Sequence, residues 1–321
     1  MNMKQFDSLM KECYGKDVYV GFSGGADSTM VLLIADYFKN IYNYKVKAVH
    51  FEHGLRGNEA LDDADHCIDF CNKRNIDIEV IHLNLKNCSQ IENVARQARL
   101  DWWNKNCDEN SIVMLGHHLD DQIENFFIRM SRGSNITGLI GIRKISKMNE
   151  FTIIRPLLET SKKDIEKFLE KENINWVIDG TNNDCICQRN YLRNKLLPEW
   201  YKQHGFIYGG IKQSLNTISE DADFIENEVE NKFKEIENVN GISIDFWKRL
   251  HNAIRVRLLR KWVNTCIVEY VLSKSLVEQF NRMCESFDNT DHKHLKINND
   301  YEFLFKANKT YIQRFVNENS N

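Results

Sequence analysis

Short apolar runs rich in β-branched residues alternate with helical patterns through the first half of the chain. The runs lie at 18–22, 46–51, 78–83, 112–116 and 151–155. The helical patterns lie at 27–39, 59–74, 91–107 and 120–132. Strands and helices that alternate at this spacing form βαβ units, in which parallel strands carry helices on both faces. We therefore predict an α/β, Rossmann-like fold, a parallel sheet flanked by helices, with ligand-binding residues beyond the carboxyl ends of its strands.

The second part of the chain has a different pattern. From Leu215 to Ile236 apolar residues recur every three or four positions, which predicts a long amphipathic helix. The pattern breaks at 205–213, and 321 residues are enough for two domains of about 150 residues each. We expect a catalytic domain at 1–205 and a smaller, mainly helical domain at 206–321.

The formal net charge of -3 argues against a dedicated nucleic-acid-binding protein, but basic residues are concentrated locally. The segment 248–261 holds six basic and no acidic residues between two tryptophans. Such a stripe would bind RNA phosphates, with Arg249, Arg255, Arg257, Arg260 and Lys261 as the predicted contacts. The alternative is a core-facing helix with an ordinary basic outer face.

The nine cysteines include no C-x-x-C pair, and no stretch approaches the roughly 18 apolar residues of a membrane span. The N-terminus lacks the apolar core and small-residue cleavage site of a signal peptide. We expect a cytoplasmic protein with reduced thiols and no membrane partner. Cys185 and Cys187, which share a loop, are the only candidates for metal or redox chemistry.

The first strand runs into "VYVGFSGGADSTMVLL" (18–33), which ends in glycines before a helix begins. Glycines allow a tight turn without a Cβ to obstruct an anion, and the helix directs its N-terminal amides into that turn. This predicts a phosphate-binding loop formed by Ser23, Gly24, Gly25, Ala26, Asp27 and Ser28. The alternative is an ordinary Gly-Gly turn with a capped helix.

Two further strands end in polar side chains. The second is followed by His53 and Arg56, and the fourth by "GHHLDDQIEN" (116–125). Asp121 and Glu124 share one helical face, where they could hold Mg²⁺ or receive an amine, or could simply suit the helix dipole. His117 and His118 are adjacent, so at most one faces the nucleotide, and we select His117.

The string S-G-G-A-D-S between a strand and a helix resembles the PP-loop of the N-type ATP pyrophosphatases, which cut ATP between its α and β phosphates. Further segments, in matching order over residues 18–198, resemble the tRNA(Ile)-lysidine synthetase family. They are "HFEHGLRG" (50–57), "ENVARQARL" (92–100), "GHHLDDQIENFFIRMSRGSNITGLIGI" (116–142), "IIRPLLETSK" (153–162), "WVIDGTNND" (176–184) and "RNYLRNKLLP" (189–198).

This resemblance implies an adenine nucleotide alpha hydrolase-like fold and an ATP-dependent ligase. The family adenylates the C2 carbonyl oxygen of the wobble cytidine, position 34, of a CAU-anticodon tRNA(Ile). Free L-lysine then displaces AMP to form lysidine. ATP with Mg²⁺, the tRNA and lysine are therefore the expected ligands, and a homodimer is implied. The chain resembles the shorter family architecture, and the family's "R-Y" stands here as Arg99-Leu100.

The resemblance also extends the set of site residues. Arg96, paired with Arg99, matches the family's arginines, and R-N-x-x-R places Arg189 and Arg193 near the reaction centre. We predict ATP contacts at residues 23–28, His53 and Arg56, tRNA contacts at Arg193 and Lys195, and Mg²⁺ at Asp121. The predicted catalytic residues are Asp27, Arg96, His117, Asp121, Glu124 and Arg189.

Two alternative functions stay open. A PP-loop tRNA thiolase also adenylates a base carbonyl but needs reactive cysteines, for which only Cys185 and Cys187 are available. A non-catalytic nucleotide-binding module needs the loop but not the surrounding charged residues.

Overall fold

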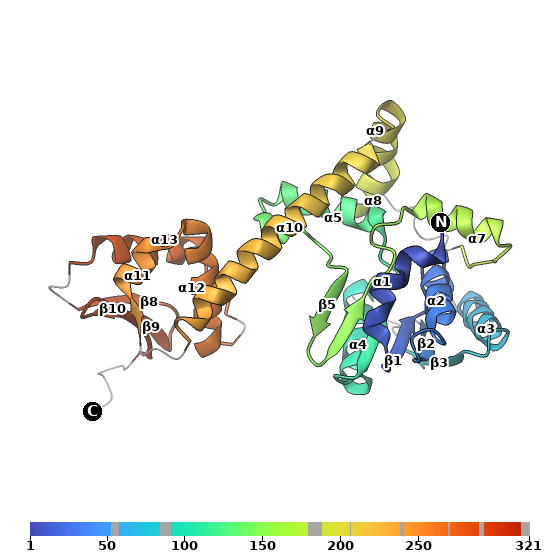
Figure 1. The fold of residues 1–321 in the computed structure, drawn as a ribbon, viewed down its shortest axis with the longest axis horizontal. Helices are drawn as coiled ribbons and strands as arrows, with labels where there is room; N and C mark the ends of the chain where they lie inside the picture. Colours follow the sequence, from blue (N-terminus) through green and yellow to red (C-terminus); the bar gives the residue numbers. More distant parts are fainter. Residues whose placement is uncertain are drawn as a thin grey trace. The chain divides into compact units, whose positions relative to one another are not determined.

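The computed structural model describes residues 1–52, 58–83, 91–178, 188–205, 207–237, 241–268, 270–288 and 292–315. The chain forms two compact units, Met1–Ile218 and Ser219–Asn321 (Figure 1). The division falls inside helix α10 (Ile207–Lys234), later in the chain than the expected boundary between residues 205 and 206. The two domains expected at 1–205 and 206–321 stay a prediction.

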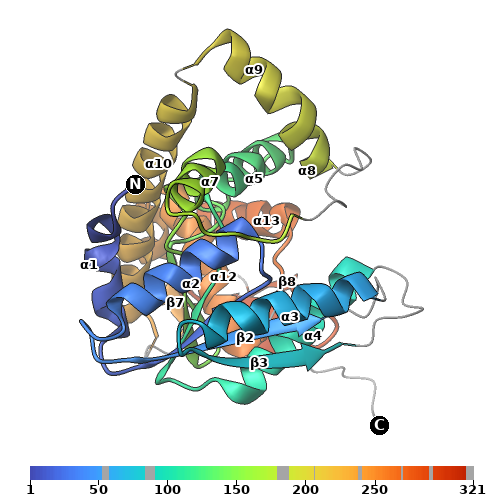
Figure 2. The ribbon, with the colours of Figure 1, turned by 90° about the vertical axis from the view of Figure 1, so that its right-hand side faces the viewer.

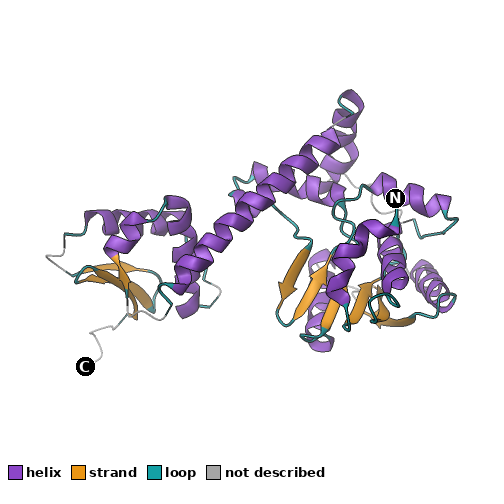
Figure 3. Ribbon diagram, viewed as in Figure 1, coloured by secondary structure: helices purple, strands orange, loops and turns teal. Residues whose placement is uncertain are grey.

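A mainly parallel sheet forms the centre of the first unit (Figure 3). Its strand order is β3-β2-β1-β4-β6-β5. The parallel strands are β1 (Asp17–Gly21), β2 (Lys45–Glu52), β3 (Asp77–His82), β4 (Ser111–Met114) and β6 (Phe151–Ile154). These are the five predicted strands, so the predicted parallel sheet is confirmed. The edge strand β5 (Ile145–Met148) pairs antiparallel with β6 and was not predicted.

Helices cover both faces of this sheet because the strand residues alternate between two apolar layers. Val18 and Val20 of β1 pack into one layer, while Tyr19 packs into the other. The longer helices are α2 (Ala26–Phe38), α3 (Asn58–Asn72), α4 (Ile91–Asn106), α5 (Leu119–Ser131) and α7 (Lys162–Lys171). The layer of Val18 and Val20 holds residues of α2, α3 and α7, and that of Tyr19 holds Trp103 of α4. Figure 2 shows α2 and α3 on the same side of β2 and β3.

Shorter helical segments complete the first unit. They are η1 (Met3–Phe6), α1 (Asp7–Met10), η2 (Lys11–Cys13), α6 (Ile136–Leu139), α8 (Gln188–Tyr191), η4 (Leu192–Leu196) and α9 (Leu197–Gln203). Leu192 and Leu197 pack against Leu119 and Ile123 of α5, which fixes the 188–203 segment beside the start of that helix.

The second unit combines helices with a four-stranded antiparallel sheet of order β7-β10-β9-β8. The strands are β7 (Ile242–Ser243), β8 (Lys293–Lys296), β9 (Tyr301–Lys306) and β10 (Lys309–Arg314). The helices are the end of α10, α11 (Ile244–Arg249), α12 (Asn252–Cys266) and α13 (Lys274–Ser286). Trp247, Phe280 and Phe303 are fully buried in its core. The predicted amphipathic helix is confirmed as α10, whereas the sheet was not predicted.

Among the described residues, no helix combines the length and the apolar composition that crossing a lipid bilayer requires.

Candidate functional site

The Ser23–Ser28 loop leads from the end of β1 into the first turn of α2, and hydrogen bonds within the loop hold its shape. Gly24 has φ +82°, and a Cβ there would lie 3.0 Å from the Cys67 Sγ and 3.1 Å from the Val177 Cγ2. Ser28 Oγ accepts from the Ser23 N–H at 3.1 Å and donates to the Gly25 carbonyl at 3.0 Å. The first amides of α2 follow directly, and the free amides of a helix start favour an anion. The loop therefore has the geometry of a phosphate site.

The end of β4 lies against this loop. A Cβ on Gly116, two residues beyond β4, would come within 3.1 Å of the Asp27 Cβ and 3.2 Å of the Ser28 N. The chain leaves β1 for β2 on one side and later returns to β4 on the other side of β1. This reversal is the position at which parallel α/β sheets bind ligands. The loop and the polar residues after β4 therefore meet at the switch point of the sheet.

His118 lies among three carboxylates at this point. Its Nδ1 is 3.3 Å from Asp120 Oδ2, and its Nε2 is 3.5 Å from Asp121 Oδ2 and 3.9 Å from Asp27 Oδ2. Burial alone would lower the pKa of His118, but the three carboxylates raise it above its usual value. His118 thus carries positive charge more readily than an exposed histidine.

Asp120 is held in its charged form. Burial opposes its ionisation, but the His118 ring 3.3 Å away and hydrogen bonds from the Tyr208 hydroxyl and the backbone N–H of Lys162 lower the pKa of Asp120 to about 2. This carboxylate joins the start of α5 to α7 and α10, so it fixes the elements around the site.

His117, the histidine that we selected, is placed differently. Its Nδ1 is buried and has no hydrogen-bond partner among the described residues. Burial lowers the pKa of His117 to about 4, against the opposing charge of Asp121. The structure thus brings His118 rather than His117 against the carboxylates, while His117 is neutral at physiological pH.

Glu124 and Asp121 are bound by arginines. Glu124 is 0% exposed and receives Arg193 Nε at 2.6 Å and Nη2 at 3.1 Å, with Arg189 Nε at 3.2 Å. Burial raises the pKa of Glu124, and the arginines partly offset this. Arg193 also donates to Asp121 Oδ1 at 3.0 Å, and the His118 N–H donates to Asp121 Oδ2 at 3.0 Å. Both oxygens of Asp121, the predicted Mg²⁺ ligand, therefore already accept hydrogen bonds.

Comparison with known proteins matches residues 1–200 to the PP-loop domain family. The chain belongs to the PP-loop family. The predicted family and fold class are thereby confirmed, and the Ser23–Ser28 loop is hereafter the PP-loop.

The similar curated proteins are longer than this chain. The tRNA(Ile)-lysidine synthase of Clostridioides difficile (strain 630) is 34% identical over 261 residues, 77% of this chain and 55% of that protein. The tRNA(Ile)-lysidine synthase of Haemophilus influenzae (strain PittEE) is 27% identical over 284 residues, 87% of this chain and 66% of that protein. The chain thus spans a little over half to about two thirds of the length of these relatives.

A solved structure shares the fold. The U34-tRNA thiolase NcsA from Methanococcus maripaludis, which carries a 4Fe–4S cluster, is similar with a TM-score of 0.51 at 20% identity. The match covers 68% of this chain and 80% of the thiolase.

Several predicted site residues lie apart from the PP-loop and the carboxylates around His118, or lie outside the described residues. Arg96 is exposed on α4, and within the described part of the chain no hydrogen bond or ion pair joins it to the cluster. Lys195 is exposed. His53, Arg56, Cys185 and Cys187 lie outside the described residues.

The basic stripe of the second unit is divided between two helices, and some of its side chains already bind other groups of the same unit. Arg255 donates to the carbonyls of Lys248 and Leu250 and pairs with Glu285. Lys261 pairs with Glu230, and Arg257 donates to the Ala253 carbonyl. Arg249 and Arg260 are exposed. The tRNA contacts of the basic stripe stay a prediction. The two exposed arginines are the members of the stripe most accessible to a tRNA phosphate.

Lys162, Asp120 and Tyr208 were not among the predicted site residues. Lys162 Nζ contacts both oxygens of Asp27, at 2.8 and 2.9 Å. The signal available in the sequence was a lysine at a Ser-capped helix start, the last residue of the segment "IIRPLLETSK" (153–162) that resembles the family. Lysines at exposed helix starts are too common for that signal to be specific.

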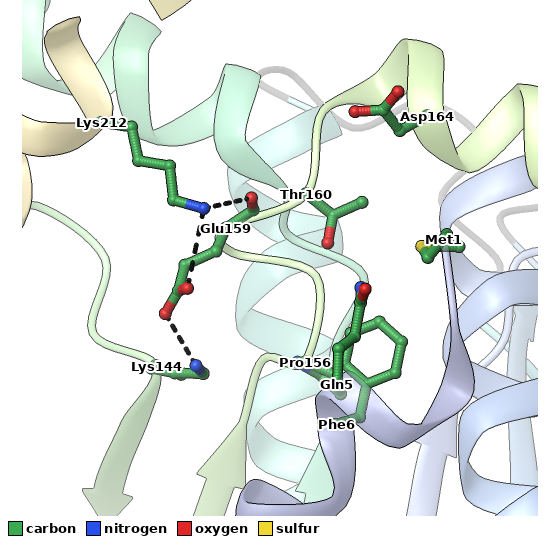
Figure 4. Close-up of a pocket in the computed structure, with 9 residues that line it drawn as sticks. All are labelled: Met1, Gln5, Phe6, Lys144, Pro156, Glu159, Thr160, Asp164 and Lys212. Atoms are coloured by element: carbon green, nitrogen blue, oxygen red, sulfur yellow. Dashed lines mark hydrogen bonds and ion pairs between the residues drawn. The ribbon is translucent and has the colours of Figure 1, made fainter. Parts of the chain in front are cut away.

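A pocket of about 480 Å³ lies beside the segment that leads into α7 (Figure 4). Lys144 and Lys212 both reach Glu159 at its rim, while Thr160 and Asp164 line it. It contains none of the predicted site residues, and its lysines are paired within the protein. The chemistry that we infer therefore lies at the switch point and not in this pocket.

Proposed function

We propose that this PP-loop protein is a tRNA(Ile)-lysidine synthase, acting in the cytoplasm as a homodimer. It would use ATP to adenylate the C2 carbonyl oxygen of the wobble cytidine in CAU-anticodon tRNA(Ile), releasing diphosphate, and the amine of L-lysine would then attack C2 and displace AMP. The observation that carries the proposal is the contact between the PP-loop and the His118–carboxylate cluster at one switch point. The names of the curated relatives support the same reaction.

The two parts of the site suit the two halves of this reaction. The PP-loop would receive the diphosphate that leaves ATP, since helix-start amides stabilise anionic charge. Asp121 and Glu124 would attract the ammonium group of lysine, which would have to replace Arg193 at one of the carboxylate oxygens, because both carboxylates already accept from that arginine. Arg193 would hold these carboxylates in place, while Arg189, which is more exposed, lies nearer solvent for a tRNA phosphate.

Mg²⁺ would accompany ATP, and Asp27 fits it better than Asp121. The Asp27 side chain is 29% exposed, against 14% for Asp121. The oxygens of both carboxylates already accept hydrogen bonds, those of Asp27 from Lys162 and those of Asp121 from Arg193 and the His118 backbone. A carboxylate together with phosphate oxygens is the usual set of protein-bound Mg²⁺ ligands. When bound, the ion would neutralise charge on the phosphates.

The test is the incorporation of radiolabelled lysine into a CAU-anticodon tRNA(Ile) transcript with ATP and Mg²⁺. We expect label in the tRNA, and AMP only when lysine and tRNA are both present, whereas tRNA and ATP without lysine should release at most one diphosphate per adenylated tRNA. Asp121→Ala should abolish incorporation and keep the fold, whereas Asp69→Ala, an exposed residue of α3, should retain activity. Absence of label with the folded wild-type protein would refute the proposal.

The thiolase alternative makes a different demand on cysteine. The buried thiols of Cys13, Cys67, Cys71, Cys107 and Cys284 have pKa values that burial raises to about 12, which makes them poor nucleophiles. A Cys185→Ser/Cys187→Ser variant should therefore retain lysine incorporation. Loss of all turnover with ATP binding intact would favour the thiolase instead.

A further inference from the structure

Lys162 connects three elements at the switch point. It is the first residue of α7, and its Nζ lies 2.8 and 2.9 Å from the two carboxylate oxygens of Asp27 in the PP-loop. Its backbone N–H donates to Asp120 Oδ2 at 2.8 Å, and the preceding Thr160 carbonyl accepts from the Leu119 N–H at 3.0 Å. The start of α7 is thereby fixed against the starts of both α2 and α5.

Asp27 creates an electrostatic conflict that Lys162 resolves. A carboxylate in the first turn of a helix interacts favourably with the helix dipole, so Asp27 suits α2. The same charge would repel a phosphate that approaches the same amides. Among the described residues, Lys162 is the only group that donates hydrogen bonds to Asp27, and His118 Nε2 is 3.9 Å away.

The other cations of the cluster are committed elsewhere. Arg193 binds Glu124 and Asp121, and Arg189 binds Glu124. Without Lys162, Asp27 would therefore present negative charge to the anion site, and of the cations in the described ranges His118 alone would remain nearby.

We propose that Lys162 is a positioning residue for the diphosphate end of the nucleotide. It neutralises Asp27 and fixes its direction, so that the amides of the PP-loop face the phosphates with net positive potential. The inference rests on the proposed function only in that the PP-loop takes a diphosphate group.

The test measures the binding of inorganic pyrophosphate to the full chain by calorimetry, without Mg²⁺. Lys162→Met should weaken binding about tenfold at low ionic strength, since an unpaired charge a few ångströms away acts strongly at a partly buried site. The loss should shrink in high salt, which screens charges, and Lys162→Arg should bind within about threefold of wild type. Lys163→Met, the exposed neighbour, should leave binding unchanged.

A double-mutant cycle separates this role from direct phosphate binding. In an Asp27→Asn background there is no charge to neutralise, so adding Lys162→Met should change the dissociation constant less than about threefold. An equal loss in both backgrounds would overturn the proposal, as would wild-type affinity in Lys162→Met or no pyrophosphate binding by the wild-type protein. If the cycle behaves as expected but lysine does not enter tRNA, the role of Lys162 stands and the proposed function fails.

Discussion

The charges around the PP-loop are arranged in pairs. Asp27 is paired with Lys162, and the arginine Arg193 bridges Asp121 and Glu124. Because these pairs are partly or fully buried, removing one partner would leave a charge without compensation, which costs more than losing an exposed ion pair. The site is therefore arranged before any substrate binds, which reduces the cost of ordering it during the reaction.

Which side chains meet at the site follows only partly from the sequence. The run "GHHLDDQIEN" located the histidines and carboxylates, but not which histidine faces them, since that depends on the backbone direction after β4. The Asp27–Lys162 pair joins residues 135 positions apart, and no local pattern predicts such a contact. Sequence reasoning found the chemical groups, while tertiary packing decided their partners.

We predict that His117 makes the protein lose stability in mild acid. Its pKa is about 4 in the folded protein because it is buried, against about 6.5 in an unfolded chain. Between these values the unfolded chain binds more protons, so stability falls as pH drops from about 6.5 towards 4. From pH 7.5 to pH 5 the wild type should lose about 2 kcal/mol more than His117→Asn, measured by urea unfolding.

His118 provides the opposite control. Its carboxylate neighbours raise its pKa, so its contribution is full below about pH 6.5 and is lost as pH rises through the raised value. His118→Asn should therefore lose stability relative to wild type in acid. Parallel pH profiles for the wild type and both variants would show that neither histidine titrates as described.

The segment after β4 packs closely against the first turn of α2, which leads to a prediction about Gly116. A Cβ on Gly116 would meet the Asp27 Cβ and the Ser28 backbone, and neither is the flexible end of a side chain. Gly116→Ala should therefore push α2 from its place, reduce pyrophosphate affinity more than about tenfold and destabilise the fold by about 2 kcal/mol. Calorimetry and urea unfolding would measure both effects.

Gly209→Ala is the matched control in helix α10. Apart from its chain neighbours and the backbone of α10 itself, no described atom lies within 4 Å of its added Cβ, so the substitution should keep pyrophosphate affinity and stabilise the helix by about 0.5–1 kcal/mol. If Gly116→Ala binds pyrophosphate as tightly as this control, the close approach of β4 does not shape the PP-loop.

The strands that the sequence did not predict lack the buried apolar runs or the turn signals by which strands are recognised. The predicted strands are buried runs such as β1 and β4, whose apolar residues have no other plausible place. The edge strand β5 is half exposed and mixes polar with apolar residues. In the second unit, the β9–β10 hairpin turns at Ala307 and Asn308, both with positive φ, without the Asn-Gly signal that usually marks such a turn.

At the level of the whole molecule, the question is whether the second unit binds RNA. The chain is slightly acidic overall, so any tRNA affinity must come from local clusters of basic residues. Arg255 and Lys261 already bind groups of their own unit, which leaves Arg249 and Arg260 exposed on α11 and α12. Fewer of the basic residues in 248–261 would thus be available to contact tRNA phosphates than the sequence suggests.

We predict that these two arginines supply salt-dependent tRNA affinity. Each phosphate contact releases counterions, so Arg249→Gln/Arg260→Gln should weaken tRNA binding and reduce the slope of log affinity against log salt by about 2. Filter binding of the full chain between low and high KCl would measure the slope. Arg282→Gln, an exposed arginine of α13, should leave the slope unchanged. If the double variant matches this control, the stripe does not contact tRNA, and the affinity must come from the arginines of the first unit.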